Sequence, residues 1–160
     1  YHELMVDAVI HGWGYEGKTV DDLIEDVQAL GAHTVVDIRL TPISRKKGFS
    51  KTRLREALEE AGVAYLHFRS LGNPKDNRAA FAHPGSNEAV EAYSRFRTEV
   101  LNTDEGQVAV HELAELASGG TVLVLCYEAN HSQCHRRLVI DEVRSLLIAN
   151  QSGNPESGSI

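Results

Sequence analysis

Residues that can do chemistry gather in the segment TVLVLCYEANHSQCHRRLVI, at positions 121–140. Cys126 ends an apolar run, and Glu128 follows it closely. Cys134 and His135 stand next to each other a few positions later. A thiol at the end of a buried strand can act as a nucleophile, while carboxylate and imidazole groups can transfer protons. Cys126, Glu128, Cys134 and His135 are therefore our candidate catalytic residues.

The position of Cys134 decides how reactive its thiol should be. The apolar pattern predicts a last helix from about Gln133 to Asn150, which places Cys134 and Arg136 in its first turn. Unpaired backbone N–H groups at a helix start favour negative charge. We therefore expect a depressed pKa for the Cys134 thiol and an anion-binding role for Arg136. The alternative is that Cys134 is a small buried apolar residue.

The two thiols could also support other chemistry. A disulfide between Cys126 and Cys134 is geometrically conceivable, but a reducing compartment disfavours it as a structural bond, and a redox-active pair stays open. Zinc could use both thiols together with His131 and His135. Adjacent residues of a helix point about 100° apart, so Cys134 and His135 should not share one ion. We predict no metal site.

The elements that must position these residues alternate along the chain as predicted strands and helices. Strands are expected at 6–11, 34–39, 63–68 and 121–126. Helices are expected from a cap at Thr19 to Gly31, from Ser50 to Gly62, and at about 87–101, 105–118 and 133–150. The tail at 151–160 is polar and is predicted to be disordered.

Strands separated by helices predict one α/β domain over 1–150. Its expected form is a three-layer domain, with a mainly parallel four-stranded sheet flanked by about five helices. Right-handed crossovers leave few strand orders, of which we prefer 3-2-1-4. Ligands bind where the strand order reverses, which would lie between the first and fourth strands.

Most of the other unusual polar residues follow the ends of the predicted strands. Because the carboxyl ends of parallel strands meet at one edge of a sheet, we expect these residues to form one site. The candidate ligand-binding residues are Tyr15 and Glu16 after the first strand, Asp37, Arg39, Ser44 and Arg45 at the second, His67 and Arg78 at the third, and Arg136 after the fourth.

Several of these candidates have two interpretations. Asp37 and Arg39 point to the same side of a strand, so they either orient the arginine toward a ligand or satisfy each other. Glu16 and Glu128 follow strands that should be neighbours, and they could form an acid–base pair or simply lie near helix starts. His67 could be a base, a ligand contact or a hydrogen-bonded core histidine.

The charge of the chain is unevenly distributed. The whole sequence has a net charge of −7, yet residues 39–78 contain ten Lys and Arg against four Asp and Glu. A local basic region favours an anionic small molecule or a nucleic acid as partner. The alternative is a solvated surface of one helix and two loops.

Other function classes receive less support from the sequence. No apolar stretch reaches the roughly 20 residues that span a bilayer, so we expect no membrane contact. No secretory signal is visible, which predicts a cytoplasmic protein. The Gly12, Gly14 and Gly17 spacing matches a dinucleotide-binding pattern, but Glu16 would place an acid against the pyrophosphate. The sequence does not identify any cofactor.

Motifs along most of the chain together resemble a known bacterial family. They are GYEG, DIR followed by PISRKKGFS, AYLHF with LGNP and a later Arg78, and LCYE with CHR. These motifs are similar to the domain of unknown function 488, over about residues 8–148. The stretch IHGWGYEG departs from the family, which tends to have Thr-Ile-Gly at that strand end.

The resemblance implies a compact α/β domain and no established activity. It also implies signature positions at Asp37, Arg39, Pro42, Ser44, Arg45, His67, Cys126, Glu128, Cys134, His135 and Arg136. Our leading hypothesis is an enzyme that acts on a phosphate-bearing substrate derived from a nucleotide or nucleic acid. The alternatives are a non-catalytic module that binds nucleic acid or an acidic partner, and a thiol-based redox or sulfur-transfer protein.

Overall fold

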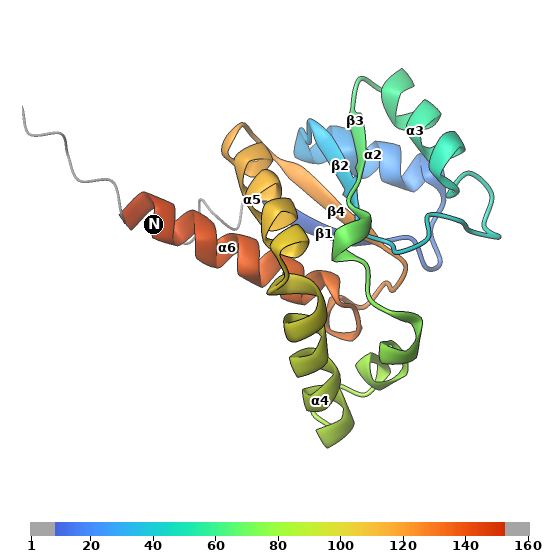
Figure 1. The fold of residues 1–160 in the computed structure, drawn as a ribbon. Helices are drawn as coiled ribbons and strands as arrows, with labels where there is room; N and C mark the ends of the chain where they lie inside the picture. Colours follow the sequence, from blue (N-terminus) through green and yellow to red (C-terminus); the bar gives the residue numbers. More distant parts are fainter. Residues whose placement is uncertain (1–8, 153–160) are drawn as a thin grey trace, which may run out of the picture.

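A parallel four-stranded sheet forms the centre of the computed structural model, which describes residues 9–152 (Figure 1). The strands are β1 (Ile10–Gly14), β2 (Thr34–Asp37), β3 (Ala64–His67) and β4 (Val122–Cys126). The helices are α2 (Val20–Leu30), α3 (Lys51–Glu60), α4 (Asn87–Phe96), α5 (Asp104–Ser118) and α6 (Arg136–Ser152). Short 3-10 turns lie at Arg69–Leu71, Lys75–Asn77, Ala79–Ala82 and His131–Gln133, and a π-helical turn at Arg97–Leu101 joins α4 to α5.

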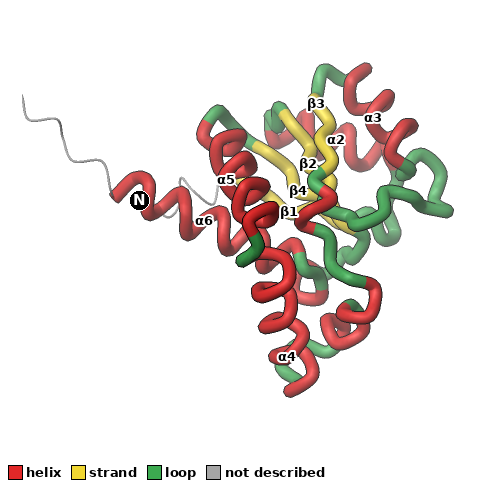
Figure 2. The backbone as a smooth tube through the Cα atoms, in the orientation of Figure 1, coloured by secondary structure: helices red, strands yellow, loops and turns green. Residues whose placement is uncertain are grey.

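Helices cover both faces of the sheet, which confirms the predicted α/β domain with a parallel sheet (Figure 2). Alternate residues of β4 point to opposite faces. Leu123 and Leu125 belong to an apolar cluster with residues of α2 and α3. Val122, Val124 and Cys126 belong to a second cluster with residues of α4, α5 and α6.

The strand order differs from the expected 3-2-1-4. The observed order is β1-β4-β2-β3, so β4 lies between β1 and β2 and pairs with both in parallel. All five residues of β4 are buried, whereas β3 alternates between buried and exposed positions. The most apolar strand therefore takes a central place, and β1 and β3 form the edges. The expected adjacency of the first and fourth strands is confirmed.

The predicted start of the chain's first helix is confirmed in detail. Thr19 accepts a hydrogen bond from the backbone N–H of Asp22, whose carboxylate accepts one from the N–H of Thr19. This capping box fixes the beginning of α2, and Gly31 ends the helix with φ 66°. β1 begins later than expected and continues to Gly14, while positions 6–8 of the predicted strand lie outside the described residues.

The last helix begins later than expected. A 3-10 turn ends at Gln133, Cys134 is extended with φ −127° and ψ 143°, and α6 starts at Arg136. The prediction that Cys134 lies in the first turn of this helix is therefore wrong. At its other end α6 continues to Ser152, and the remaining positions of the predicted tail lie outside the described residues.

The register brings the carboxyl ends of the strands together. Gly14 pairs with Cys126, and Asp37 pairs with both Leu125 and His67. The segments that follow each strand therefore leave from one edge of the sheet. Within the described part of the chain, no helix has the length and apolar character needed to cross a membrane.

Candidate functional site

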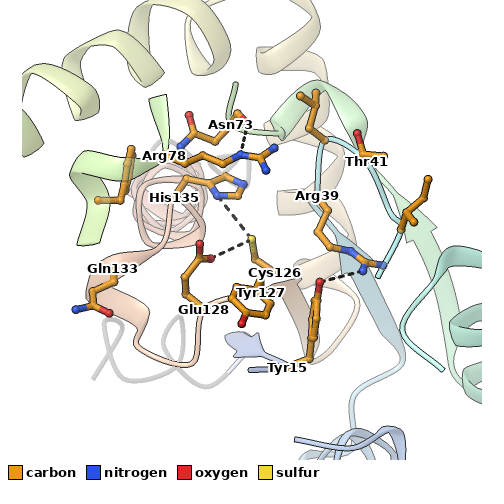
Figure 3. A pocket seen from close by; sticks show the side chains of 13 residues that line it. Tyr15, Arg39, Thr41, Asn73, Arg78, Cys126, Tyr127, Glu128, Gln133 and His135 are labelled. Atoms are coloured by element: carbon orange, nitrogen blue, oxygen red, sulfur yellow. Dashed lines mark hydrogen bonds between the residues drawn. The ribbon is translucent and has the colours of Figure 1, made fainter. Parts of the chain in front are cut away.

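A pocket of about 210 Å³ lies at this edge and receives residues from the segments after all four strands (Figure 3). The expectation that distant loops meet at one place is therefore met for part of the predicted set. The lining consists of Tyr15 after β1; Arg39, Leu40, Thr41 and Ile43 after β2; Asn73, Arg78 and Phe81 after β3; and Cys126, Tyr127, Glu128, Gln133 and His135 at and after β4.

Three of the four candidate catalytic residues meet at the bottom of the pocket. The Sγ atom of Cys126 lies 3.7 Å from Oε2 of Glu128 and 3.7 Å from Nδ1 of His135. Cys126 and His135 are buried, whereas Glu128 is half-buried. Figure 3 shows the carboxylate and the imidazole approaching the sulfur from two directions. A thiol with a base and an acid beside it can act as an activated nucleophile.

The orientation of His135 follows from its second ring nitrogen. Nε2 lies 3.2 Å from the backbone oxygen of Ile38, and the ring packs edge-on against Phe96 at 5.4 Å between centroids. A carbonyl oxygen only accepts hydrogen bonds, so Nε2 must carry a proton to donate one. In the neutral imidazole, Nδ1 is then unprotonated, and its lone pair faces the two cysteine sulfurs.

Cys134 lies behind the pocket rather than in its lining. Its Sγ is 3.7 Å from Nδ1 of His135, and the sulfurs of Cys126 and Cys134 and this nitrogen all lie within 4.8 Å of one another. We call these three residues the thiol cluster. Because Cys134 is extended, it and His135 converge, and the expectation that they point apart is wrong. Both cysteines are free thiols.

The predicted depression of the Cys134 pKa is also wrong. Burial raises the pKa of this thiol well above its usual value, and the neighbouring Cys126 thiol raises it further, while His135 offsets part of the effect. A charged sulfur is disfavoured in an apolar environment unless a positive partner accompanies it. Cys134 is therefore a neutral thiol beside Cys126, as the alternative reading of a small buried residue proposed.

A second buried cluster consists of Asp37 at the end of β2, Arg39 just after it, and Tyr65 in β3. We call it the paired cluster. Arg39 donates from Nε and Nη2 to the Asp37 carboxylate at 2.7–3.1 Å, and the backbone N–H of Arg39 donates to the same group at 3.0 Å. Tyr65 donates its hydroxyl proton to Asp37 at 2.6 Å. The carboxylate is completely buried and fully engaged by these donors.

The contacts within the paired cluster determine which of its members carry a charge. Burial alone would lower the pKa of Arg39, but the hydrogen bonds and attraction of Asp37 outweigh it, and the pKa is raised. Burial, followed by the negative charge of Asp37, raises the pKa of Tyr65. Arg39 thus remains a cation, and its Nη1 also reaches the hydroxyl oxygen of Tyr15 at 3.5 Å in the pocket wall. The two residues therefore satisfy each other, as one interpretation of the pair predicted, and Arg39 also lines the pocket.

Arg78 supplies a second guanidinium to the pocket. Its Nε donates to the backbone oxygen of Asn73 at 3.0 Å, and the residue itself is exposed. Asn73 is held in turn by Asn77, whose amide donates to the Asn73 side chain at 3.1 Å and to the Ala92 carbonyl of α4 at 3.0 Å. The segment between β3 and α4 therefore forms a hydrogen-bonded support for Arg78.

Besides Asp37 and Arg136, four predicted ligand-binding residues do not line this pocket. Glu16 is exposed and accepts a hydrogen bond from the backbone N–H of Ala129 at 3.4 Å, so the structure does not pair it with Glu128. His67 donates from Nε2 to the carbonyl of Arg39 at 2.7 Å, which positions the backbone of the paired cluster. Ser44 accepts a hydrogen bond from the N–H of Lys46, and Arg45 is exposed in the same loop.

Arg136 begins α6, as predicted, but its side chain contacts the protein itself instead of facing an open anion site. It is buried and donates to the backbone oxygens of Glu128 and Ala129, the latter at 3.2 Å. The glycines of β1 make room for this arrangement. A Cβ atom on Gly12 would lie 2.9 Å from Nε of Arg136, and one on Gly14 would lie 1.9 Å from the oxygen of Glu128. The glycine spacing that resembles a dinucleotide pattern thus allows close packing.

The cations of the basic region at 39–78 differ in how far the fold engages them, and Arg45, Arg53 and Arg69 are exposed. Arg39 is engaged by Asp37, and Lys46 donates to the carbonyl of Tyr15 at 3.1 Å. Arg55 lies over the ring of Tyr65 at 5.4 Å. Several of these cations therefore have partners inside the fold, and Arg39 and Arg78 are the members that line the pocket.

Sequence reasoning missed several residues of the pocket. Gln133 and Thr41 line it, as do Asn73 and Phe81 from the long segment between β3 and α4. Loops of this kind carry no periodicity from which an inward-facing side chain can be recognised. The buried asparagines in LGNPKDN are the one local signal, since buried amides usually hold a loop together by hydrogen bonds.

The comparison with family models gives a match over residues 19–143, described as domain of unknown function DUF488. Neither the search of curated proteins nor the search of solved structures gave a match. The matched region covers most of the chain and includes β2, β3, β4 and the segments that follow them. It does not include Tyr15, which enters the pocket from β1. The chain therefore belongs to the family of the domain of unknown function DUF488.

Proposed function

We propose that this protein is an enzyme that uses the Cys126 thiol as a nucleophile on a small phosphate-bearing substrate. The observation that carries the proposal is the placing of Sγ at 3.7 Å from both Glu128 and His135, in a pocket that Arg39 and Arg78 also line. Guanidinium N–H groups bind phosphate oxygens. Nε and Nη2 of Arg39 face Asp37 and Nε of Arg78 faces Asn73, so an anion would be bound through Nη1 of Arg39 and the terminal nitrogens of Arg78. An anion held by these arginines would have its electrophilic centre presented to the sulfur.

His135 is the proposed base. Its Nδ1 lone pair faces Cys126, and its Nε2–H is fixed on the carbonyl of Ile38. In the first step the thiol proton moves from Sγ to Nδ1, and the thiolate attacks phosphorus. An S–P bond forms as the bond from phosphorus to the leaving oxygen breaks, and the imidazolium returns its proton to that oxygen. Water then attacks phosphorus as Glu128 takes one of its protons, and the S–P bond breaks. The proton passes from Glu128 to the released sulfur, which leaves phosphate and the free thiol.

The size of the pocket limits the substrate. Pockets for drug-sized ligands are typically about 300–1,000 Å³, and this pocket is about 210 Å³. It suits a phosphate group and a small part of the molecule attached to it, with the remainder outside. A nucleotide would therefore enter by its phosphate rather than by its base.

Alkylation of Cys126 tests the anion site without a known substrate. Iodoacetate is an anion and iodoacetamide is neutral, so the ratio of their rates with Cys126 reports attraction by the arginines. We expect Arg78→Ala to lower this ratio about tenfold and inorganic phosphate to protect the thiol. Arg95→Ala is the matched control, because Arg95 is engaged by Asp76 and Glu99 outside the pocket. An unchanged ratio in Arg78→Ala, with no protection by phosphate, overturns the proposal.

Turnover tests the reaction itself. A panel of phosphate monoesters should include substrates that leave a phosphorylated Cys126 after acid quenching, detected by mass spectrometry. Cys126→Ala should abolish the adduct, and Glu128→Gln should slow turnover by about 10²–10⁴-fold. Hydrolysis at the wild-type rate by Cys126→Ala would contradict a covalent thiol mechanism.

A second candidate function is thiol-based redox or sulfur transfer, which the closeness of the two cysteine sulfurs favours. The raised pKa of Cys134 makes it a poor attacking thiol near neutral pH, so we rank this function second. Mild oxidation followed by peptide mapping tests it. An intramolecular Cys126–Cys134 disulfide that dithiothreitol reverses would support it, and separate oxidation of the two thiols would contradict it.

A further inference from the structure

Cys134 has no part in the proposed reaction, although it lies within 4.8 Å of both groups that do the chemistry. It does not line the pocket, and it is buried. Apolar packing alone does not require its sulfur to face an imidazole nitrogen and a second sulfur. The three atoms are soft or borderline donors of the kind that bind zinc.

The two nitrogen–sulfur distances within the thiol cluster match those of a tetrahedral zinc site, and the two sulfurs lie within 4.8 Å of each other, against about 3.8 Å for two thiolates on one zinc ion. Zinc lies about 2.3 Å from thiolate sulfur and about 2.0–2.1 Å from imidazole nitrogen, which for tetrahedral angles separates sulfur and nitrogen ligands by about 3.6 Å. Nδ1 of His135 lies 3.7 Å from Sγ of Cys126 and 3.7 Å from Sγ of Cys134. An ion could therefore bind between the three atoms with little movement of the side chains.

His135 also has the hydrogen bond that metal-binding histidines need. Such histidines donate their other ring N–H to a carbonyl or carboxylate, which fixes the ring and makes the ligating nitrogen more basic. Nε2 of His135 faces the carbonyl of Ile38 at 3.2 Å, at the end of the neighbouring strand. The nitrogen that faces the sulfurs is therefore the one available to a metal.

The charges balance as well. Two thiolates and a neutral imidazole around Zn²⁺ carry no net charge, so the loaded site can be buried at a low cost in free energy. A divalent ion provides the positive partner that the Cys134 sulfur lacks within the cluster.

We propose that Cys126, Cys134 and His135 form a three-ligand zinc site whose fourth position opens on the pocket beside Glu128. Cys126 and His135 line the pocket and Cys134 lies behind it, so the open position falls on the pocket side. Water or the Glu128 carboxylate, 3.7 Å from the Cys126 sulfur, can occupy it. This inference does not rest on the proposed function, because zinc binding is measured without turnover. A bound ion would cover the nucleophile, so the loaded protein should resist alkylation at Cys126.

Metal titration of the reduced, chelator-treated full chain tests the proposal. Zn²⁺ titrated against a chromogenic chelator should bind in one equivalent. Co²⁺ should give a sulfur-to-cobalt charge-transfer band in the near ultraviolet and the intense visible bands of tetrahedral coordination. Weak visible bands typical of octahedral cobalt, or less than one equivalent of zinc, would overturn the proposal whether or not the variants below fold.

Variants then assign the ligands. Loss of a group that only supports a ligand weakens metal affinity 10–100-fold, so loss of a ligand should weaken it by more than about 100-fold. We expect this for Cys134→Ser and His135→Ala, with folding checked by circular dichroism. His83→Ala is the matched control, because His83 is exposed and outside the cluster. Equal affinity in Cys134→Ser and His83→Ala would exclude the site.

The pH dependence gives a further signature. Zinc displaces one proton from each cysteine, so the dissociation constant should rise about 100-fold for each unit that pH falls below neutrality. A site built from carboxylates would lose little affinity over the same range. Absence of zinc binding together with phosphate protection of Cys126 would remove this inference and leave the proposed function standing. Zinc binding without phosphate protection of Cys126 would support this inference and remove the proposed function.

Discussion

The ends of β2 and β4 are neighbours in the sheet, yet they carry buried polar clusters of opposite character. In the paired cluster the Asp37 carboxylate receives hydrogen bonds of 2.6–3.1 Å from Arg39 and Tyr65. In the thiol cluster each sulfur lies 3.7 Å from the His135 nitrogen. The first cluster has short, charge-assisted bonds that resist change. The second has long, weak contacts, which leave its sulfurs available to a proton, an electrophile or a metal.

The largest effect should come from removing the charge at the centre of the paired cluster. Asp37→Asn leaves Arg39 as a buried cation without its carboxylate, so we expect a loss of about 3–5 kcal/mol in the free energy of unfolding, measured with urea. Asp76→Asn is the matched control, because Asp76 forms an exposed ion pair with Arg95. Similar stability of the two variants would show that the paired cluster does not hold the sheet edge.

Tyr65→Phe should have a smaller effect, since it removes one hydrogen bond to a buried carboxylate and leaves the ion pair. We expect a cost of about 1.5–3 kcal/mol. The raised pKa of Tyr65 adds a pH dependence. Its protonated form is favoured by folding, so this contribution is complete below pH 10.0, the usual pKa, and is lost as pH rises further. A wild-type alkaline decline that persists unchanged in Tyr65→Phe would contradict this assignment.

Gly14→Ala tests the link between β1 and the thiol cluster. The new Cβ would meet the carbonyl of Glu128, so the segment after β4 must move. We expect a cost of about 1–3 kcal/mol and a changed alkylation rate at Cys126. Gly17→Ala is an informative control, because a Cβ there meets no atom within 4 Å and only its positive φ is strained. Normal thiol reactivity in Gly14→Ala would show that the two segments are not coupled.

The smallest stability effect should come from the thiol cluster. Cys126→Ala in metal-free protein removes one sulfur with long contacts, and we expect a change of about 1 kcal/mol or less. Alkylation should nevertheless disappear from this position, as peptide mapping would show. A stability loss as large as that of Asp37→Asn would mean that the two clusters do not differ in the way described.

The architecture was accessible from sequence because strands and helix ends leave local signals. Thr19 and Gly31 bracket α2, a β-branched run marks β2, and an apolar run marks β4. The strand order was not accessible, since right-handed crossovers permit more than one arrangement. The five consecutive apolar residues of β4 were the available clue to its central place.

The sequence predicted which strand ends form the candidate site, but it predicted the arrangement of the side chains there less well. Cys126, Glu128 and His135 follow one strand, so their closeness could be expected. The 3-10 turn before α6 could not be predicted, because the sequence HSQC at 131–134 contains no glycine or proline to mark a break before the helix. Arg136 lies in the first turn of α6, as predicted, but the partners of its side chain could not be predicted. Its contacts depend on Gly12 and Gly14, which are distant in the chain.

β4 is bonded along both sides, to β1 and to β2, and its last residue is Cys126. Backbone amides in such a strand are released to solvent only when most of the molecule opens. The sulfur is thus anchored to the slowest-exchanging part of the chain, whereas Arg78 and Phe81 sit on short turns beyond the sheet. Adjustment to molecules of different shape would therefore come from these turns and from the other loops that line the pocket, while the sulfur keeps its position.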